Sequence, residues 1–213
     1  MILKREKLEK YPVIGSGGQG KIYQIDKNTV VKVSDNINIE LLKRMSNTSL
    51  KQFIMPMEEV YDGEYCYTFT FPLLDKVKNE SALILSKNQI LQNIDILVED
   101  IREISKQRII LADVVPINSF CIDKTIYMFD YDLYYFASEC LSEEEIFKIN
   151  LSKLNFYFRK LWIIGLIETG IDRLNLRFHP EYICDNCISA FKEDMLETET
   201  MKEYIKRRLN SGI

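Results

Sequence analysis

The chain has 213 residues, of which 46% are hydrophobic and 28% charged, and its formal net charge at pH 7 is −4. This length suits one large domain or two small lobes with a buried core, and this composition excludes a largely disordered chain. The net negative charge argues against a broad nucleic-acid-binding surface. The longest apolar run, residues 161–167, is far shorter than the roughly 20 residues that cross a bilayer, so we expect no membrane span.

The cysteines and the N-terminus bear on the cellular compartment. The first ten residues are charged throughout and lack the apolar stretch of a signal peptide, and the five cysteines are widely spread. Reduced thiols and a cytoplasmic location are therefore expected. His179, Cys184 and Cys187 offer three of the four ligands of a closed zinc site. Cys140 could supply the fourth, but the spacing does not require it, and we expect buried or incidental thiols there.

The first third of the chain predicts a small β-rich lobe, residues 1–74. Here β-branched and aromatic runs alternate with turn signals. Strands are expected over 21–25, 29–33, 52–60 and 64–71, and Pro72 should end the last one because proline cannot donate a ladder hydrogen bond. A short helix is expected over 37–45, capped by the polar residues at 34–36.

The remainder, residues 75–213, predicts a larger, mostly helical lobe. Apolar residues recur every three or four positions, which indicates one face of a long helix that ends near residue 106: Ile90, Ile94, Leu97, Ile101 and Ile104. A β-hairpin is expected over 120–129. Ser142 and Glu145 have the spacing of a capping box, which predicts the start of another helix. An interruption is expected at 177–180, and a final helix should run to about residue 209.

A glycine cluster, Gly15-x-Gly17-x-x-Gly20, precedes the first of these strands. A dinucleotide-binding fold needs a helix directly after such glycines, but residues 21–25 favour a strand. A Walker A loop is excluded because no Gly-Lys-Ser/Thr follows at the required spacing. The cluster is either a flexible turn or a flap that joins two antiparallel strands and covers phosphates. The flap residues would be Gly15, Ser16, Gly17, Gly18, Gln19 and Gly20.

A lysine lies within the strand predicted over 29–33. Lys32 either points to solvent from the sheet surface or contacts nucleotide phosphates beside the flap. A phosphate-binding lysine needs an acidic partner to orient it, and Glu40 is the carboxylate that the following helix offers. The alternative for Glu40 is a solvated position, paired with Lys43 or Arg44.

Two acidic motifs in the second lobe complete a pattern. Asp113 and Asn118 have the spacing D-x-x-x-x-N, and Asp130-Tyr131-Asp132 begins twelve residues after Asn118. Separately, these residues could be loop caps and turn formers. In this order after a flap, a strand lysine and a helix glutamate, the chain over roughly residues 11–135 resembles the protein-kinase-like superfamily, with its H-R-D-x-x-x-x-N and D-F-G motifs.

The resemblance implies a fold and a set of roles. The fold would be α+β and two-lobed, with a small antiparallel sheet and one helix in the first lobe and a truncated helical second lobe. Lys32, oriented by Glu40, would bind the α and β phosphates of ATP. Asn118 and Asp130 would hold Mg²⁺, a cation that prefers oxygen ligands. Asp113 would orient the acceptor hydroxyl or accept its proton.

The resemblance also implies an adenine site near the end of the first lobe. Apolar residues near Val13, Val30 and 71–74 would enclose the base, with Phe71 and Leu73 as the named contacts. The glycine flap would lie over the phosphates and exclude water.

Several departures from the family pattern bear on the acceptor. Leu111-Ala112 stands in place of His-Arg, and Val115 stands where serine/threonine kinases carry a lysine. Asp132 replaces the glycine of D-F-G and offers a second metal contact. The stretch 130–142 is too short for an ordinary activation and substrate-docking segment, and no A-P-E motif follows.

The leading hypothesis is a small atypical protein kinase that transfers the γ-phosphoryl group of ATP to a Ser/Thr or similar hydroxyl. The alternatives are a small-molecule kinase of the same fold, and a catalytically weak pseudokinase that acts as a nucleotide-binding or scaffold module. The phosphoacceptor, protein or small molecule, is not identified by the sequence.

Overall fold

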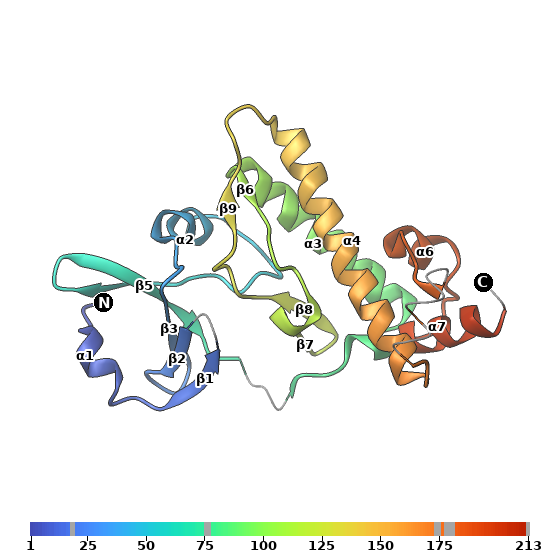
Figure 1. Cartoon of the computed structure of the whole chain (residues 1–213), viewed down its shortest axis with the longest axis horizontal. Helices are drawn as coiled ribbons and strands as arrows, with labels where there is room; N and C mark the ends of the chain where they lie inside the picture. The colour runs from blue at the N-terminus through green and yellow to red at the C-terminus, as the bar shows by residue number, and fades with distance from the viewer. Residues whose placement is uncertain (18–19, 75–77, 173–175, 177–181, 212–213) are drawn as a thin grey trace.

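A computed structural model of the whole chain describes residues 1–17, 20–74, 78–172, 176 and 182–211. The chain forms two lobes (Figure 1). The first contains a five-stranded sheet and short helices, and the second is a helical lobe around α3 (Lys87–Lys106) and α4 (Glu143–Glu168). The α+β, two-lobed arrangement predicted from the sequence is confirmed. The expected interruption at 177–180 lies outside the described residues.

The first lobe is an antiparallel sheet in the order β1-β2-β3-β5-β4. Its strands are β1 (Val13–Gly17), β2 (Gly20–Gln24), β3 (Thr29–Ser34), β4 (Glu59–Asp62) and β5 (Tyr65–Pro72), and α1 (Arg5–Leu8) precedes them. One face of the sheet buries a small apolar cluster together with the N-terminal segment. That cluster consists of Leu3, Leu8, Tyr23, Val31, Val60 and Tyr67.

The other face of the sheet receives α2 (Ile39–Ser46). The helix begins after Asn38, whose Oδ1 accepts the backbone N–H of Leu41 at 3.1 Å, so the cap lies just beyond the residues 34–36 predicted for it. Leu41, Leu42 and Met45 lie on the buried side of α2. They join the main core of the second lobe, and one continuous apolar core therefore underlies both lobes.

The strand predicted over 52–60 is wrong for residues 52–58, because β4 begins only at Glu59. The backbone of residues 52–54 bonds instead to the second lobe. The Met128 N–H donates to the Gln52 carbonyl at 2.7 Å, and the Ile54 N–H donates to the Met128 carbonyl at 2.8 Å. The apolar run at this position therefore serves as a junction between the lobes rather than as a strand of the first sheet.

A buried carboxylate fixes this junction. Asp100 on α3 accepts the backbone N–H of Lys51 at 3.0 Å and that of Gln52 at 2.7 Å. Burial raises the pKa of the Asp100 carboxyl above its ordinary value, although these two N–H groups oppose the shift. Because the folded chain holds this proton more tightly than the unfolded chain, the associated stability is present at low pH and is lost as the pH rises through the folded pKa.

We expect Asp100→Asn to lower the free energy of unfolding near pH 4 by about 1–3 kcal/mol, because a carboxamide has only one oxygen to offer to the two N–H groups. The advantage of the wild type over this variant should shrink as the pH rises from about 4, because only the wild type has the titrating group. Urea unfolding of both chains across this pH range measures the difference. An advantage that grows with pH would contradict the assignment.

The second lobe is built on two packed helices and a β-ribbon. α3 covers the residues predicted for the long helix, and the predicted capping box of α4 is present, with the Ser142 hydroxyl bonded to the Glu145 N–H at 3.3 Å. The hairpin is formed by β7 (Ser119–Ile122) and β8 (Thr125–Met128). β6 (Ile109–Ile110) pairs with β9 (Tyr135–Phe136). α6 (Cys187–Glu193) and α7 (Met201–Asn210) complete the lobe.

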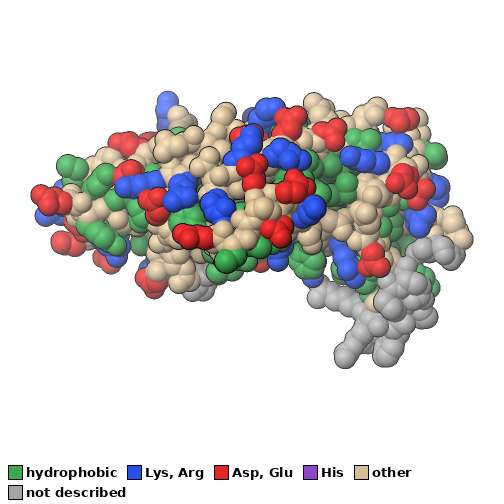
Figure 2. Space-filling view, turned by 90° about the horizontal axis from the view of Figure 1, so that it is seen from above, with side chains coloured by type: hydrophobic (Ala, Val, Ile, Leu, Met, Phe, Trp, Pro, Cys, Tyr) green, Lys and Arg blue, Asp and Glu red, His purple; other side chains and the backbone are tan. Residues whose placement is uncertain are grey.

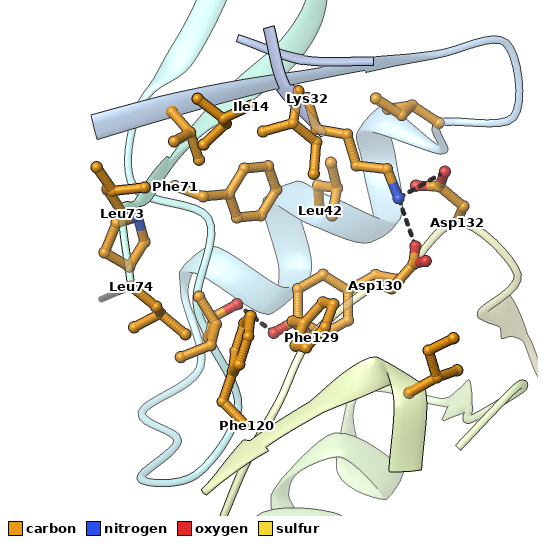
Figure 3. Close-up of a pocket in the computed structure, with 17 residues that line it drawn as sticks. Ile14, Lys32, Leu42, Phe71, Leu73, Leu74, Phe120, Phe129, Asp130 and Asp132 are labelled. Atoms are coloured by element: carbon orange, nitrogen blue, oxygen red, sulfur yellow. Dashed lines mark hydrogen bonds and ion pairs between the residues drawn. The ribbon is translucent and has the colours of Figure 1, made fainter. Parts of the chain in front are cut away.

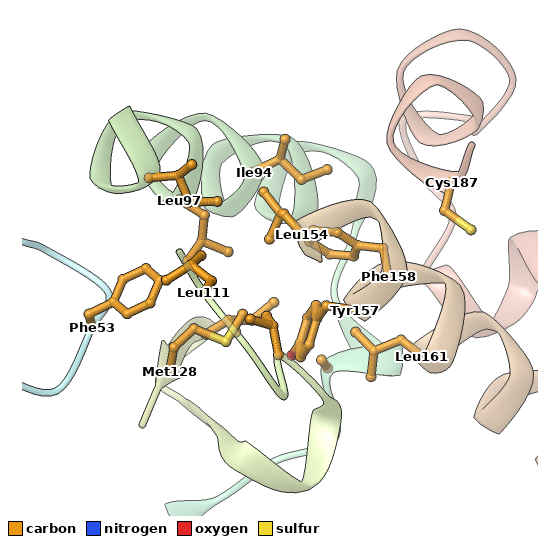
Figure 4. Close-up of a cluster of buried hydrophobic side chains, with 14 of the residues drawn as sticks. Phe53, Ile94, Leu97, Leu111, Met128, Leu154, Tyr157, Phe158, Leu161 and Cys187 are labelled. Atoms are coloured by element: carbon orange, nitrogen blue, oxygen red, sulfur yellow. The ribbon is translucent and has the colours of Figure 1, made fainter. Parts of the chain in front are cut away.

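The core of this lobe lies between α3, α4 and the β7–β8 ribbon (Figure 4). Leu97 and Leu154 are fully buried between the two helices, and Met128 meets them from the ribbon. Within the described ranges, none of the helices has the length and apolar character needed to cross a membrane. On the face seen in Figure 2, acidic and basic side chains are interspersed.

Candidate active site

Lys32 lies in β3, with its side chain directed toward the second lobe (Figure 3). Its backbone is fixed on both sides: Lys32 is paired with Ile22 in the β2–β3 ladder, and the Thr68 hydroxyl donates a hydrogen bond to its carbonyl oxygen. The Lys32 ammonium donates to the Asp130 carboxylate and lies 2.9 Å from Oδ2 of Asp132. The lysine therefore does not point to solvent, since its side chain is only 17% exposed.

A cavity of about 410 Å³ opens beside this lysine. Lys32, Asp130 and Asp132 are the charged residues among the described residues that line it. Apolar side chains from both lobes form the rest of the wall. The cavity is therefore an apolar enclosure with charges at one end, which suits a planar ring system that carries a charged group. The wall includes Ile14, Ile22, Val30, Leu42, Phe71, Leu73, Phe120 and Phe129.

The adenine contacts predicted from the sequence divide into two groups. Val30, Phe71 and Leu73 line the cavity. Val13 is 50% exposed and does not line the cavity; its neighbour Ile14 does. Because successive side chains of a strand point to opposite faces, the residue of β1 that faces the cavity is Ile14 and not Val13.

The second lobe contributes Asp130 and Asp132 from the segment after β8. Between them, Tyr131 points the other way into the core: it is 5% exposed, and its hydroxyl donates to the Ile54 carbonyl. Burial raises the pKa of the Tyr131 hydroxyl well above its ordinary value, so the group remains a donor. The buried tyrosine thus anchors a segment whose two flanking carboxylates face Lys32.

Asp113 and Asn118 form a second polar pair next to this segment. The Asn118 amide donates to the Asp113 carboxylate at 2.9 Å and to the Asp113 carbonyl at 3.0 Å. The Asn118 carbonyl in turn accepts the N–H of Phe129 at 3.1 Å, which places Asn118 beside the strand that leads to Asp130. Neither Asp113 nor Asn118 lines the cavity itself.

Two of these carboxylates lie on unusual backbone. Asp113 has φ 54° and Asp130 has φ 72°. This left-handed region is uncommon for residues other than glycine and is found where the surrounding structure enforces it, often at functional sites. Both aspartates that the spacing predicted lie in this region, which they share with Arg108, Asp123 and Lys124.

The predicted ion pair between Lys32 and Glu40 is wrong for this structure. The Glu40 carboxylate is 61% exposed and bonds to Nε of Arg44 at 3.2 Å, one turn further along α2. The alternative considered from the sequence, a solvated helix position, describes it. The lysine finds its acidic partners in the second lobe instead, and sequence spacing alone gave no sign of this exchange.

The glycine cluster joins β1 to β2. Gly15, Ser16 and Gly17 belong to β1, Gly20 begins β2, and Gly17 is paired with Gly20 in the ladder. Gly18 and Gln19 lie outside the described residues. The two antiparallel strands agree with the expected flap, and Ile14 and Ile22 on them line the cavity.

We expect Gly20→Ala to weaken the first lobe, whereas Gly17→Ala should be neutral. A Cβ at Gly20 would lie 2.2 Å from the Val33 carbonyl oxygen, while a Cβ at Gly17 would meet nothing within 4 Å. Because the obstacle at Gly20 is backbone, the strands must separate, at about 1–3 kcal/mol. Chemical unfolding of both variants measures the difference, and equal midpoints would show that the β2–β3 spacing is not as described.

The cysteines do not join this site. The Cys187 thiol donates to the Cys184 carbonyl at 3.3 Å, and Cys187 is buried. His179 lies outside the described residues. Over the part of the chain that the structure describes, no three His, Cys, Asp or Glu side chains gather as a metal site.

No protein-family model and no curated protein sequence matches the chain. Among solved structures, the chain is similar to the Legionella pneumophila Lpg2603 kinase bound to IP6, with 12% sequence identity and a TM-score of 0.48, over 95% of this chain and 81% of that chain. A likeness of this size carries no information about the chemistry of the site.

Proposed function

We propose that the chain is an ATP- and Mg²⁺-dependent phosphotransferase that transfers the γ-phosphoryl group of ATP to a hydroxyl. One observation carries the proposal: Lys32, Asp130 and Asp132 meet at the charged end of an otherwise apolar cavity between the lobes. A nucleoside triphosphate combines an apolar base with a polyanion, and this cavity offers matching surfaces to both ends.

The base would occupy the apolar part of the cavity. Phe71 and Leu73 form one wall, and Phe120 and Phe129, whose rings stack at 4.6 Å between centroids, form the opposite one. The Leu73 N–H donates to the Asn28 carbonyl at 2.7 Å and is not free for the base. Burial and stacking would therefore supply most of the affinity for the base.

The acidic groups fit a magnesium ion. The Asp130 carboxylate is paired with Lys32, and 24% of its side chain is accessible at the charged end of the cavity. Carboxylate and amide oxygens are the ligands that Mg²⁺ prefers, and one or two carboxylates together with phosphate oxygens are sufficient. Asp130 and Asn118 would hold the ion, which when bound neutralises charge on the phosphates.

The remaining roles belong to side chains of the chain itself. Lys32 would bind the α and β phosphates and keep them in place. Asp113, held by Asn118, would orient the acceptor hydroxyl and accept its proton as the γ-phosphoryl group leaves the β-phosphate oxygen. The flap would lie over the phosphates and keep water out.

The acceptor is either a Ser/Thr hydroxyl of a protein or the hydroxyl of a small molecule. A specific observation favours the second candidate. The guanidinium of Arg108 donates to the Ser138 carbonyl at 2.6 Å and to the Leu141 carbonyl at 3.1 Å, and β9 pairs with β6. The segment between Asp132 and α4 is thus bound to the lobe and offers no separate platform for a peptide.

Thermal unfolding in millimolar ATP with and without Mg²⁺ tests the proposal. We expect Mg-ATP to raise the melting temperature of the wild type, because a ligand that binds only the native state stabilises it. Asp130→Asn should remove the magnesium-dependent part of the rise. Asp123→Asn, at the exposed β7–β8 turn, is the matched control and should behave as the wild type.

Unchanged melting of the wild type at millimolar Mg-ATP would overturn the proposal. If Mg-ATP binds but no label from [γ-³²P]ATP reaches proteins, sugars, alcohols or water, the pseudokinase alternative is the correct one. The pseudokinase alternative is motivated by Val115, which stands where serine/threonine kinases carry the catalytic-loop lysine.

A further inference from the structure

We propose that Asp132, and not Glu40, is the positioning residue that orients Lys32 toward the phosphates. The inference rests on the proposed function and assigns a role to a residue that the sequence suggested only as an extra metal contact. It is carried by the arrangement of two carboxylates, Asp130 and Asp132, around the ammonium group of Lys32 (Figure 3).

The Asp132 carboxylate is almost fully buried, and a buried charge of this kind requires a cationic partner. Its side chain is 6% exposed, and its Oδ2 accepts no hydrogen bond within the described part of the chain. The Lys32 ammonium, at 2.9 Å from this oxygen, is the charge that compensates it. A buried carboxylate without such a partner would be strongly destabilising, so the two groups hold each other in place.

The backbone around Asp132 is rigid enough to serve this role. Tyr131 is anchored in the core by its hydrogen bond to Ile54, and its ring lies edge-on to Tyr134 at 5.3 Å between centroids. The Tyr134 N–H donates to the Tyr131 carbonyl at 3.0 Å and closes a turn over Asp132. The carboxylate therefore projects from a fixed turn rather than from a free loop.

Glu40 lacks each of these properties. Its carboxylate is mostly exposed and is engaged by Arg44 on the same helix. Exposed pairs of this kind contribute little, and they do not fix a neighbouring lysine. The orienting function is thus transferred from the helix of the first lobe to the segment that follows β8.

The two aspartates that contact Lys32 can take different roles when a nucleotide binds. A lysine ammonium has three donors, so Lys32 can keep Asp132 while it exchanges Asp130 for a phosphate oxygen. Asp130 is the more exposed of the two, with 24% of its side chain accessible against 6% for Asp132. Asp130 is therefore the group that becomes available to the metal, and Asp132 is the group that stays on the lysine.

A mutant cycle without nucleotide tests the pairing itself. We expect Lys32→Met and Asp132→Asn to be non-additive in melting temperature, because each removes the partner of the other. Glu40→Gln should be additive with Lys32→Met. Coupling of Lys32 to Glu40 as large as its coupling to Asp132 would overturn the assignment, and this result is independent of any nucleotide.

Nucleotide titrations test the orienting role. Asp132→Asn should weaken ATP binding in EDTA by roughly tenfold to a hundredfold, more than Glu40→Gln does, and should have no effect in the Lys32→Met background. The Mg²⁺ concentration for half-maximal tightening should be unchanged, and Asp132→Glu should restore part of the affinity. Asp123→Asn is the matched control for the substitution.

The opposite pattern would overturn the proposal. If Asp132→Asn raises the Mg²⁺ requirement and leaves metal-free ATP binding intact, Asp132 is a metal ligand. If its effect persists in the Lys32→Met background, its role is structural. Failure of the wild type to bind ATP at all would refute the proposed function, while the nucleotide-free cycle would still decide whether Asp132 holds Lys32.

Discussion

Asp113→Asn is expected to lower phosphoryl transfer by roughly 10²–10⁴-fold while Mg-ATP binding stays within about twofold of the wild type. In the proposed mechanism this carboxylate accepts the proton of the incoming hydroxyl, and a carboxamide cannot take that proton. Asparagine is preferred to alanine here because the residue has φ 54°, a conformation that asparagine adopts readily. The amide of Asn118 can still donate to the new carbonyl oxygen.

The measurement is the rate of ATP turnover, with water as the acceptor where no better one has been found, together with calorimetric titration of Mg-ATP. Asp123→Asn is the control, because it makes the same change at another left-handed position, φ 49°, at the exposed end of the β7–β8 ribbon. Turnover that survives in Asp113→Asn would remove the aspartate from the mechanism. A parallel loss of binding would assign it to the nucleotide site instead.

Asn150→Ala is expected to lower the free energy of unfolding by about 3–5 kcal/mol. Asn150 on α4 is fully buried, and it accepts the Leu111 N–H at 2.8 Å and donates to the Ile109 carbonyl at 2.9 Å and the Ser105 hydroxyl at 3.0 Å. Removal of the amide takes this partner from the buried Leu111 N–H and Ile109 carbonyl, while the Ser105 hydroxyl keeps its hydrogen bond to the Ile101 carbonyl. Each unsatisfied group contributes about 1–3 kcal/mol.

Because Leu111 lies two residues before Asp113, this substitution should also reduce turnover in the fraction that remains folded. Urea unfolding followed by fluorescence of the single tryptophan, Trp162, gives the stability. Ser152→Ala, at an exposed position on the same helix, is the control and should lie within about 0.5 kcal/mol of the wild type. A loss below about 1 kcal/mol for Asn150→Ala would mean that water replaces the missing contacts.

The fold could be predicted from local patterns where one physical cause dominates. Periodic apolar residues defined α3, and the capping box at Ser142 defined the start of α4. The strand expected over residues 52–60 was wrong before Glu59, because the backbone of Gln52 and Ile54 bonds to Met128, which lies far away in the sequence. Apolar character showed that the segment is buried, but not which lobe it joins.

The candidate site shows the same division. The residues of the motifs Asp113, Asn118 and Asp130 lie near one another, as their order suggested. The partner of Lys32 could not be predicted, because spacing along the chain does not reveal that Arg44 engages Glu40 or that Tyr131 turns Asp132 toward the first lobe. Such choices depend on burial and competition between partners, which only the assembled structure displays.

A crystal structure of the chain with Mg²⁺ and a non-hydrolysable ATP analogue would decide whether this cavity is the nucleotide site. We expect the base between Phe71 and Phe120, the phosphates on Lys32, and the ion on Asp130 and Asn118, with Asp132 still on the lysine. An analogue bound outside this cavity, or an ion that contacts neither Asp130 nor Asn118, would contradict it.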